Sequence, residues 1–359
     1  MLRCRTYSNK VDSGKYQTCY GDYGIQISSD YGKTWKRVYQ SIYSSEDTYD
    51  IAISADGKYQ FISAYIFFIS SDYGNTWRGY NPSGDTGIVA RIYGAFISHD
   101  GKCMVTMVNF TLYTSFDYGN TWSTFIFPSY ISDSLDRDFF AMSDDGRYMV
   151  ISLNTDCIYV SSNYGKNWSR IDGTYNNRAK GSAKISPDGK RMAVCHGQHG
   201  VLVSSDYGVT WEKATSVNRT WMAFAANSDC KYLVAKTSPI QQIIMTSSDY
   251  GSTWKEITAT WYCTNMTMSS DGKYILGYYV VNYNGKVFIS SDYGNTWKEI
   301  LTEAVKDVKD CAVSADGRYM TIVLGRYNDS CYISSDYGST WQKSAFGASI
   351  GTYRIAMNI

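Results

Sequence analysis

The sequence repeats an eight-residue motif at nearly constant spacing along its whole length. Residues 70–77 read SSDYGNTW, and residues 290–297 read SSDYGNTW again. Six variants bring the number of copies to eight, and successive copies lie 42 to 46 residues apart. A fixed period in this range, spread over a whole chain, is typical of repeat architectures such as propellers. The motif therefore constrains the fold more strongly than any other feature of the chain.

Each copy begins with a turn-forming acid or amide and ends with a tryptophan. The turn-forming residues are Asp30, Asp72, Asp117, Asn163, Asp206, Asp249, Asp292 and Asp336. The tryptophans are Trp35, Trp77, Trp122, Trp168, Trp211, Trp254, Trp297 and Trp341. The Asp or Asn side-chain oxygen can accept hydrogen bonds from backbone N–H groups just ahead, and the motif glycine permits a positive φ. Because eight copies of a binding site would imply eight equivalent ligands, we assign the motif to structure.

A second turn signal recurs at the same period and completes a four-stranded unit. It reads SADGKY from Ser54 and SSDGKY from Ser269, with a degenerate copy, NSDCKY, in which Cys230 replaces the glycine. Short apolar runs rich in β-branched residues separate the turns, as expected for strands. Four strands in each repeat correspond to one propeller blade. No segment keeps a helical period, so we expect almost no helix.

These patterns predict an all-β, eight-bladed β-propeller of four-stranded antiparallel blades, in a single domain spanning residues 1–359. The first unit has only three strands of its own. The segment TYRIAMNI, residues 352–359, resembles the first-strand segment TYDIAIS of the next unit. We therefore expect the C-terminal strand to join the N-terminal blade and close the ring. Residues 2–8 could supply this strand instead.

Charge and hydropathy exclude several classes of partner and location. The net charge is +1 with acids and bases interspersed, so no footprint for nucleic acid or an anionic membrane is present. No apolar run is long enough for a spanning helix, and the first residues lack a signal-peptide core. The nine cysteines lack paired spacing, which favours free thiols in a reducing compartment. We expect an intracellular protein, either cytoplasmic or, if the source is a virus, within the virion.

The pattern S-x-D-x-G-x-T-W resembles the Asp-box, or BNR repeat. This repeat occurs in sialidases, sortilin-type receptor propellers, xyloglucanase-type glycosidases and photosystem II assembly factors. The resemblance covers essentially the whole chain and implies a propeller. It does not by itself imply an activity, because this family includes both enzymes and binding proteins.

Recognition is expected on the face opposite the repeated turns. Both turns lie at one end of each blade, and the loops at the other end differ from blade to blade; variable loops on a rigid scaffold commonly carry binding residues. Our candidates on this variable-loop face are Arg178, His196, His199, Tyr283, Arg326 and Tyr327. We expect a protein or carbohydrate ligand. The two histidines lack a fixed third ligand, so we expect no metal and no cofactor.

A catalytic set is not evident. Sialidase-type chemistry, as the resemblance implies, would need an arginine triad, a Tyr–Glu nucleophile pair and an acidic Asp. Residues 353–356 read YRIA, where the F/Y-R-I-P motif would end in proline. Another glycosidase would need two facing carboxylates; Asp50, Asp138 and Asp310 near the first strands are candidates, and the alternative is that they are solvated loop acids. We therefore assign no catalytic residue and predict a non-catalytic binding or scaffold propeller, with a glycoside hydrolase as the alternative.

Overall fold

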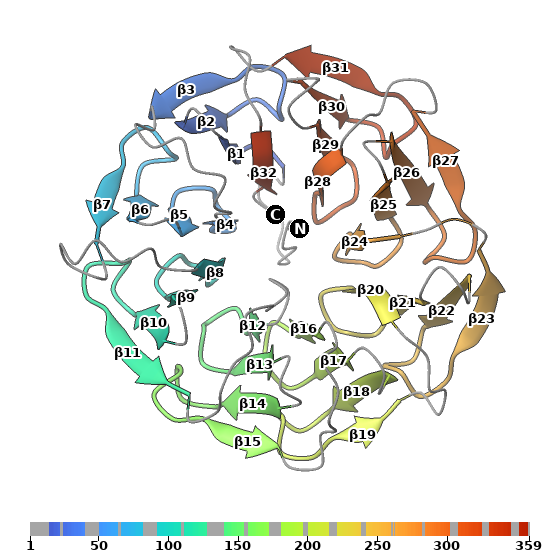
Figure 1. The fold of residues 1–359 in the computed structure, drawn as a ribbon, viewed down its shortest axis with the longest axis horizontal. Coiled ribbons are helices and arrows are strands. Elements are labelled where there is room, and N and C mark those ends of the chain that lie inside the picture. The colour runs from blue at the N-terminus through green and yellow to red at the C-terminus, as the bar shows by residue number, and fades with distance from the viewer. Residues whose placement is uncertain are drawn as a thin grey trace. The chain divides into compact units, whose positions relative to one another are not determined.

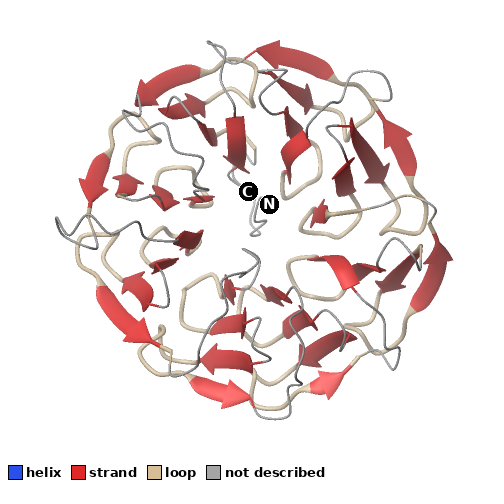
Figure 2. Cartoon of the chain, viewed as in Figure 1, coloured by secondary structure: helices blue, strands red, loops and turns tan. Residues whose placement is uncertain are grey.

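The computed structural model shows an all-β chain, with strands and turns but no helix in the part of the chain that it describes (Figure 2). The structure describes residues 14–21, 24–39, 50–63, 66–81, 92–108, 111–127, 140–153, 157–171, 181–196, 200–214, 221–237, 242–259, 261, 263–281, 284–301, 308–324, 330–345 and 352–357. No helix in these ranges is long and apolar enough to cross a membrane.

The strands form eight four-stranded antiparallel sheets, the blades of an eight-bladed propeller (Figure 1). The predicted fold class is thus confirmed. Residues Pro128–Tyr279 and Val287–Ile300 form one compact unit, which contains the fourth to seventh blades. The second unit contains the first three blades and the eighth, and it also includes Val280–Lys286, where β25 ends and β26 begins.

The strands of the second unit are as follows. The first blade consists of β32 (Thr352–Met357), β1 (Gln17–Gly21), β2 (Gly24–Ser28) and β3 (Lys36–Tyr39). The second and third consist of β4 (Asp50–Ile53), β5 (Gln60–Ser63), β6 (Phe67–Ser70), β7 (Arg78–Tyr80), β8 (Ile92–Ile97), β9 (Met104–Val108), β10 (Thr111–Ser115) and β11 (Ser123–Ile126). The eighth consists of β28 (Val308–Val313), β29 (Met320–Leu324), β30 (Ser330–Ser334) and β31 (Gln342–Ala345).

The first unit has the same blade plan. Its fourth and fifth blades consist of β12 (Phe140–Met142), β13 (Met149–Leu153), β14 (Cys157–Ser161), β15 (Ser169–Ile171), β16 (Gly181–Ile185), β17 (Met192–His196), β18 (Gly200–Ser204) and β19 (Glu212–Lys213). Its sixth and seventh consist of β20 (Trp221–Ala226), β21 (Leu233–Thr237), β22 (Ile243–Ser247), β23 (Lys255–Thr258), β24 (Asn265–Met268), β25 (Ile275–Val281), β26 (Asn284–Ser290) and β27 (Lys298–Ile300).

The C-terminal strand completes the N-terminal blade, as predicted. Strand β32 pairs antiparallel with β1, and Ala356 lies opposite Thr18 in the register. Residues 2–8, the alternative source of this strand, lie outside the described residues. The two pairing strands are more than three hundred residues apart in the sequence, so the blade forms only through a long-range contact.

The motif tryptophans link neighbouring blades. The indole N–H of Trp122 donates to the carbonyl of Gly119 in its own turn, at 3.2 Å. Its ring packs on Phe61 and Phe67 of the preceding blade, with ring centroids 5.5 and 5.1 Å apart. The ring of Trp122 thus closes its own turn and covers the core of the blade before it.

Candidate functional site

The Asp-box is a closed hydrogen-bonded turn, as the fifth blade shows. The carboxylate of Asp206 accepts from the backbone N–H of Thr210 at 2.9 Å and from the Thr210 hydroxyl at 2.6 Å. It also accepts from the Ser204 hydroxyl at 2.8 Å, and that hydroxyl oxygen accepts from the backbone N–H of Gly208. The indole N–H of Trp211 donates to the carbonyl of Gly208. The polar groups of the box therefore bind one another.

These contacts also stabilise the ionised form of the carboxyl group. The hydrogen bonds from Thr210 hold the pKa of Asp206 below its usual value, and burial opposes them only weakly. In the fourth blade Asn163 takes the same place, and its side-chain oxygen accepts from the backbone N–H of Asn167 at 2.9 Å. A negative charge is thus not essential to the geometry of the turn, and the boxes are structural turns in every blade.

The tyrosine of every box adopts a left-handed backbone conformation, which the sequence analysis did not anticipate. Tyr207 has φ 63°, and Gly208 after it has φ 81°. This conformation is unfavourable for a residue with a side chain. The ring of Tyr207 is placed against Tyr148 of the preceding blade, with centroids 4.7 Å apart. The same pairing occurs at four other blade junctions, at centroid separations of 4.1 to 4.8 Å.

Asp50 and Asp310 are neither solvated loop acids nor a substrate-facing catalytic pair. Asp50 is 3% exposed and Asp310 is fully buried. One oxygen of each carboxylate accepts from the next backbone N–H, at 2.8 Å for Asp50 and 2.9 Å for Asp310. The other oxygen accepts from the first strand of the following blade: from Ala95 at 3.0 Å for Asp50, and from Ile355 at 3.3 Å for Asp310. Both side chains thus connect adjacent blades.

The environment of Asp310 also favours its neutral form. Burial raises the pKa of Asp310 well above its usual value, and the nearby Asp50 raises it further. The two backbone N–H donors only partly oppose these effects. A carboxyl group that is both buried and hydrogen-bonded to the backbone cannot contact a sugar ring, so neither residue is available as a glycosidase acid or base.

The predicted binding residues of the variable-loop face fall where the structure gives no description. Arg178, His199, Tyr283, Arg326 and Tyr327 lie outside the described residues, as does Asp138. The backbone of His196 ends β17, and its side chain also lies outside the description. Their role as ligand-binding residues therefore stays a prediction.

The junction between the fifth and sixth blades departs from the repeat at two positions. In most other blades a tyrosine follows the DG turn, although the third blade has Cys103 there. This tyrosine lies against the glycine of the next DG turn: a Cβ on Gly189 would lie 2.3 Å from the ring of Tyr148. In the fifth blade Arg191 replaces the tyrosine, and its guanidinium lies 3.6 Å from the ring centroid of Tyr250. In the sixth blade Cys230 replaces the glycine, with φ 60°. The absent ring makes room for the added side chain, so the two replacements compensate each other.

Comparisons with known proteins agree with the fold. The BNR-Asp box repeat family matches residues 158–171, which span the fourth box. No curated protein sequence matches the chain. One similar solved structure is the dihydro-heme d1 dehydrogenase NirN, which is 11% identical with a TM-score of 0.64; the match covers 98% of this chain and 76% of that one. Another is YCF48 from Cyanidioschyzon merolae, which is 14% identical with a TM-score of 0.56; the match covers 87% of this chain and 98% of that one.

A third similar structure is the GH74 enzyme of Niastella koreensis, with 12% identity, TM-score 0.50 and coverage of 96% of this chain and 73% of that one. At these identities the likeness concerns the fold alone. The boxes carry the likeness to this repeat: one matches the family model directly, and all eight close through the same tryptophan-to-glycine contact. The chain thus carries BNR-Asp box repeats on an eight-bladed propeller fold.

Proposed function

We propose that this protein is a non-catalytic binding or scaffold propeller that recognises a protein or glycan partner through its variable-loop face. The observation that carries the proposal is the burial and hydrogen bonding of its candidate catalytic carboxylates. Both candidate catalytic acids that the structure describes, Asp50 and Asp310, are buried and hydrogen-bonded to backbone N–H groups. A glycosidase needs two carboxyl groups that reach the substrate.

The architecture supports recognition at the face opposite the boxes. The boxes and DG turns occupy one end of every blade, where their polar side chains bind one another. The loops at the other end differ in length and composition and contain Arg178, Tyr283, Arg326 and Tyr327. Arginine and tyrosine provide large contact area together with hydrogen-bond donors, which suits both peptides and sugars.

The test is a binding screen against a glycan array and a displayed peptide library, with an R326A/Y327A variant in parallel. We expect selective binding in one of the two screens and its loss in the variant. The matched control is Lys33→Ala, an exposed substitution in the first box, which should leave binding unchanged.

Two outcomes would overturn the proposal. One is a ligand whose binding depends on Lys33 but not on Arg326 and Tyr327, because this would place recognition on the turn face. The other is cleavage of a bound glycan, which would identify a hydrolase.

A further inference from the structure

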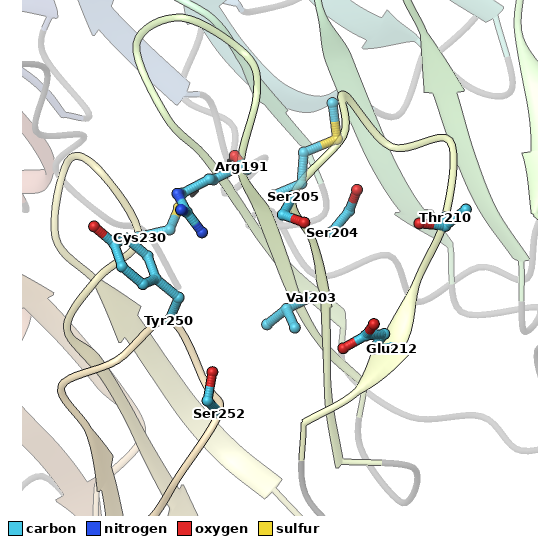
Figure 3. Close-up of a pocket in the computed structure, with 10 residues that line it drawn as sticks. Arg191, Val203, Ser204, Ser205, Thr210, Glu212, Cys230, Tyr250 and Ser252 are labelled. Carbon is cyan, nitrogen blue, oxygen red and sulfur yellow. Dashed lines mark hydrogen bonds between the residues drawn. The ribbon is translucent and has the colours of Figure 1, made fainter.

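The junction between the fifth and sixth blades contains a pocket on the turn face, away from the variable loops. Its volume is about 290 Å³. The residues around it include Arg191, Val203, Ser205, Glu212, Tyr250 and Ser252 (Figure 3). All of them belong to the same compact unit. The pocket lies where Arg191 and Cys230 replace the tyrosine and glycine of the repeat.

Arg191 is held in position but keeps its hydrogen-bond donors free. The face of its guanidinium group is covered by Tyr250, at 3.6 Å from the ring centroid. Within the described part of the chain, no carboxylate or carbonyl accepts from this guanidinium. The two other DG-turn arginines differ, since Arg147 and Arg318 each donate to a backbone carbonyl, of Ser162 and Ser335 respectively. A planar guanidinium with free donors fits a carboxylate in two-point contact.

Some of the remaining polar groups of the pocket are already hydrogen-bonded within the box, and others are not. Ser204 and Thr210 donate to Asp206 and are occupied within the box. The hydroxyl groups of Ser205 and Ser252 take part in no hydrogen bond among the described residues. Glu212 lies across the pocket from Arg191 (Figure 3). The pocket therefore presents a positive group at one side, a negative group at the other, and hydroxyl groups along its edge.

We propose that this pocket binds a small zwitterion that carries a carboxylate and an amine. The carboxylate contacts Arg191, and the ammonium group contacts Glu212. The side chain of Val203 between them contacts the methylene groups that separate the two charges. Glu212 disfavours phosphate and other multiply charged anions through like-charge repulsion. The volume is at the lower limit of small-molecule sites, which restricts the ligand to a short chain. This inference is independent of the function proposed for the variable-loop face.

The test is isothermal titration calorimetry with a series of ω-amino acids: glycine, γ-aminobutyrate and ε-aminohexanoate. Butyrate, butylamine and inorganic phosphate serve as single-charge and polyanion probes. We expect one length of amino acid to bind more tightly than butyrate and butylamine, and phosphate not to bind. The preferred length reports the distance between the two charges in the pocket.

Two variants identify the groups involved. The double variant R191Y/C230G restores the repeat seen in most other blades, so we expect it to keep the fold. We expect at least about tenfold weaker binding because a charge-assisted bidentate contact is lost. Glu212→Gln should remove the preference for the amino acid over butyrate. Arg318→Lys, in the eighth blade, is the control and should bind as the unmodified protein does.

The proposal is overturned if none of the three amino acids gives a heat of binding at millimolar concentration. It is also overturned if R191Y/C230G binds them unchanged, or if phosphate binds more tightly than all of them. The absence of any heat of binding would indicate that Arg191 and Glu212 form an ion pair with each other in solution.

Discussion

At the scale of single residues, pairs of tyrosines connect neighbouring blades. The chain contains 34 tyrosines, and at most blade junctions a DG-turn tyrosine meets a box tyrosine. The left-handed backbone of a box tyrosine costs about 1 kcal/mol. An aromatic pair contributes a similar amount beyond its burial, about 0.5–1.5 kcal/mol. The strain of Tyr207 is thus offset by its contact with Tyr148.

The glycine of the DG turn is tied to the same tyrosine, and this gives a matched pair of substitutions. Gly189→Ala would place a Cβ 2.3 Å from the Tyr148 ring, at φ 78°. We expect it to destabilise the protein by about 1–3 kcal/mol, as overpacking does. Cys230→Ala, at the same position of the next blade, already has a Cβ there and should change stability by less than about 1 kcal/mol. Calorimetric melting temperatures of the two variants test this, and equal shifts would contradict it.

Lys236 predicts a pH dependence of stability. This lysine is 1% exposed, and its Nζ donates to the carbonyl of Ala259 at 3.3 Å. Burial lowers the pKa of Lys236 to about 8. Below this pH the folded protein holds a buried charge, which is unfavourable. As the pH rises from about 8 towards the unfolded value of about 10.4, the unfolded chain binds more protons, so this group's contribution to the free energy of unfolding increases.

We therefore expect Lys236→Met to be more stable than the unmodified protein at pH 7, by about 1–3 kcal/mol. The difference should shrink between pH 8 and pH 10. Melting temperatures of both proteins across this range provide the measurement. The control is Lys255→Met, an exposed lysine whose Nζ donates to Asn295. If the two variants show the same pH profile, the effect does not come from the burial of Lys236.

At the scale of the element, each box is a turn that is held by the side-chain oxygen of its acid or amide residue, which accepts hydrogen bonds from other residues of the turn. Asp206→Ala removes an acceptor for the Ser204 hydroxyl and for both donors of Thr210. We expect a loss of about 1–2 kcal/mol, similar to the loss of a helix cap. Asp206→Asn should cost clearly less, because Asn163 already closes the fourth box. Thermal unfolding of both variants checks this, and an equal loss would mean that the charge is what matters.

The turn chemistry and the strands could be predicted from the sequence because they depend on neighbouring residues. The spacing of the boxes predicted the blade count, and the match between residues 352–359 and the first-strand pattern predicted the closing strand, with residues 2–8 as the alternative. What the sequence did not reveal depends on the neighbouring blade. The Asp50 carboxylate accepts a hydrogen bond from Ala95 of the next blade. Arg191 and Cys230 come together because the turns of two blades approach each other closely. A period along the chain contains no information on such contacts.

At the scale of the whole molecule, the pairing of β32 with β1 closes the first blade. Without β32, strand β1 would present an unpaired edge, and the Asp310 carboxylate would lose its contact with the Ile355 N–H. Exposed edges promote aggregation. We expect a chain truncated after residue 351 to aggregate or to melt at a clearly lower temperature, measured by size-exclusion chromatography and calorimetry.

The matched control is a chain truncated after Met357, which keeps the whole of β32. A synthetic peptide with the sequence TYRIAMNI, added to the chain truncated after residue 351, should restore the elution volume and melting temperature of the full-length protein through strand addition. A truncated chain that melts at the unchanged temperature without the peptide would show that β32 does not stabilise the first blade.

The same pairing has a consequence for biosynthesis. Strand β1 leaves the ribosome early, and its partner β32 is translated about 330 residues later. At 5–20 residues per second, the nascent chain carries this open edge for roughly 15–65 s. During this interval the edge is accessible to any cellular factor that captures unpaired strands. The yield of folded protein should therefore depend on the translation rate and on the supply of chaperones.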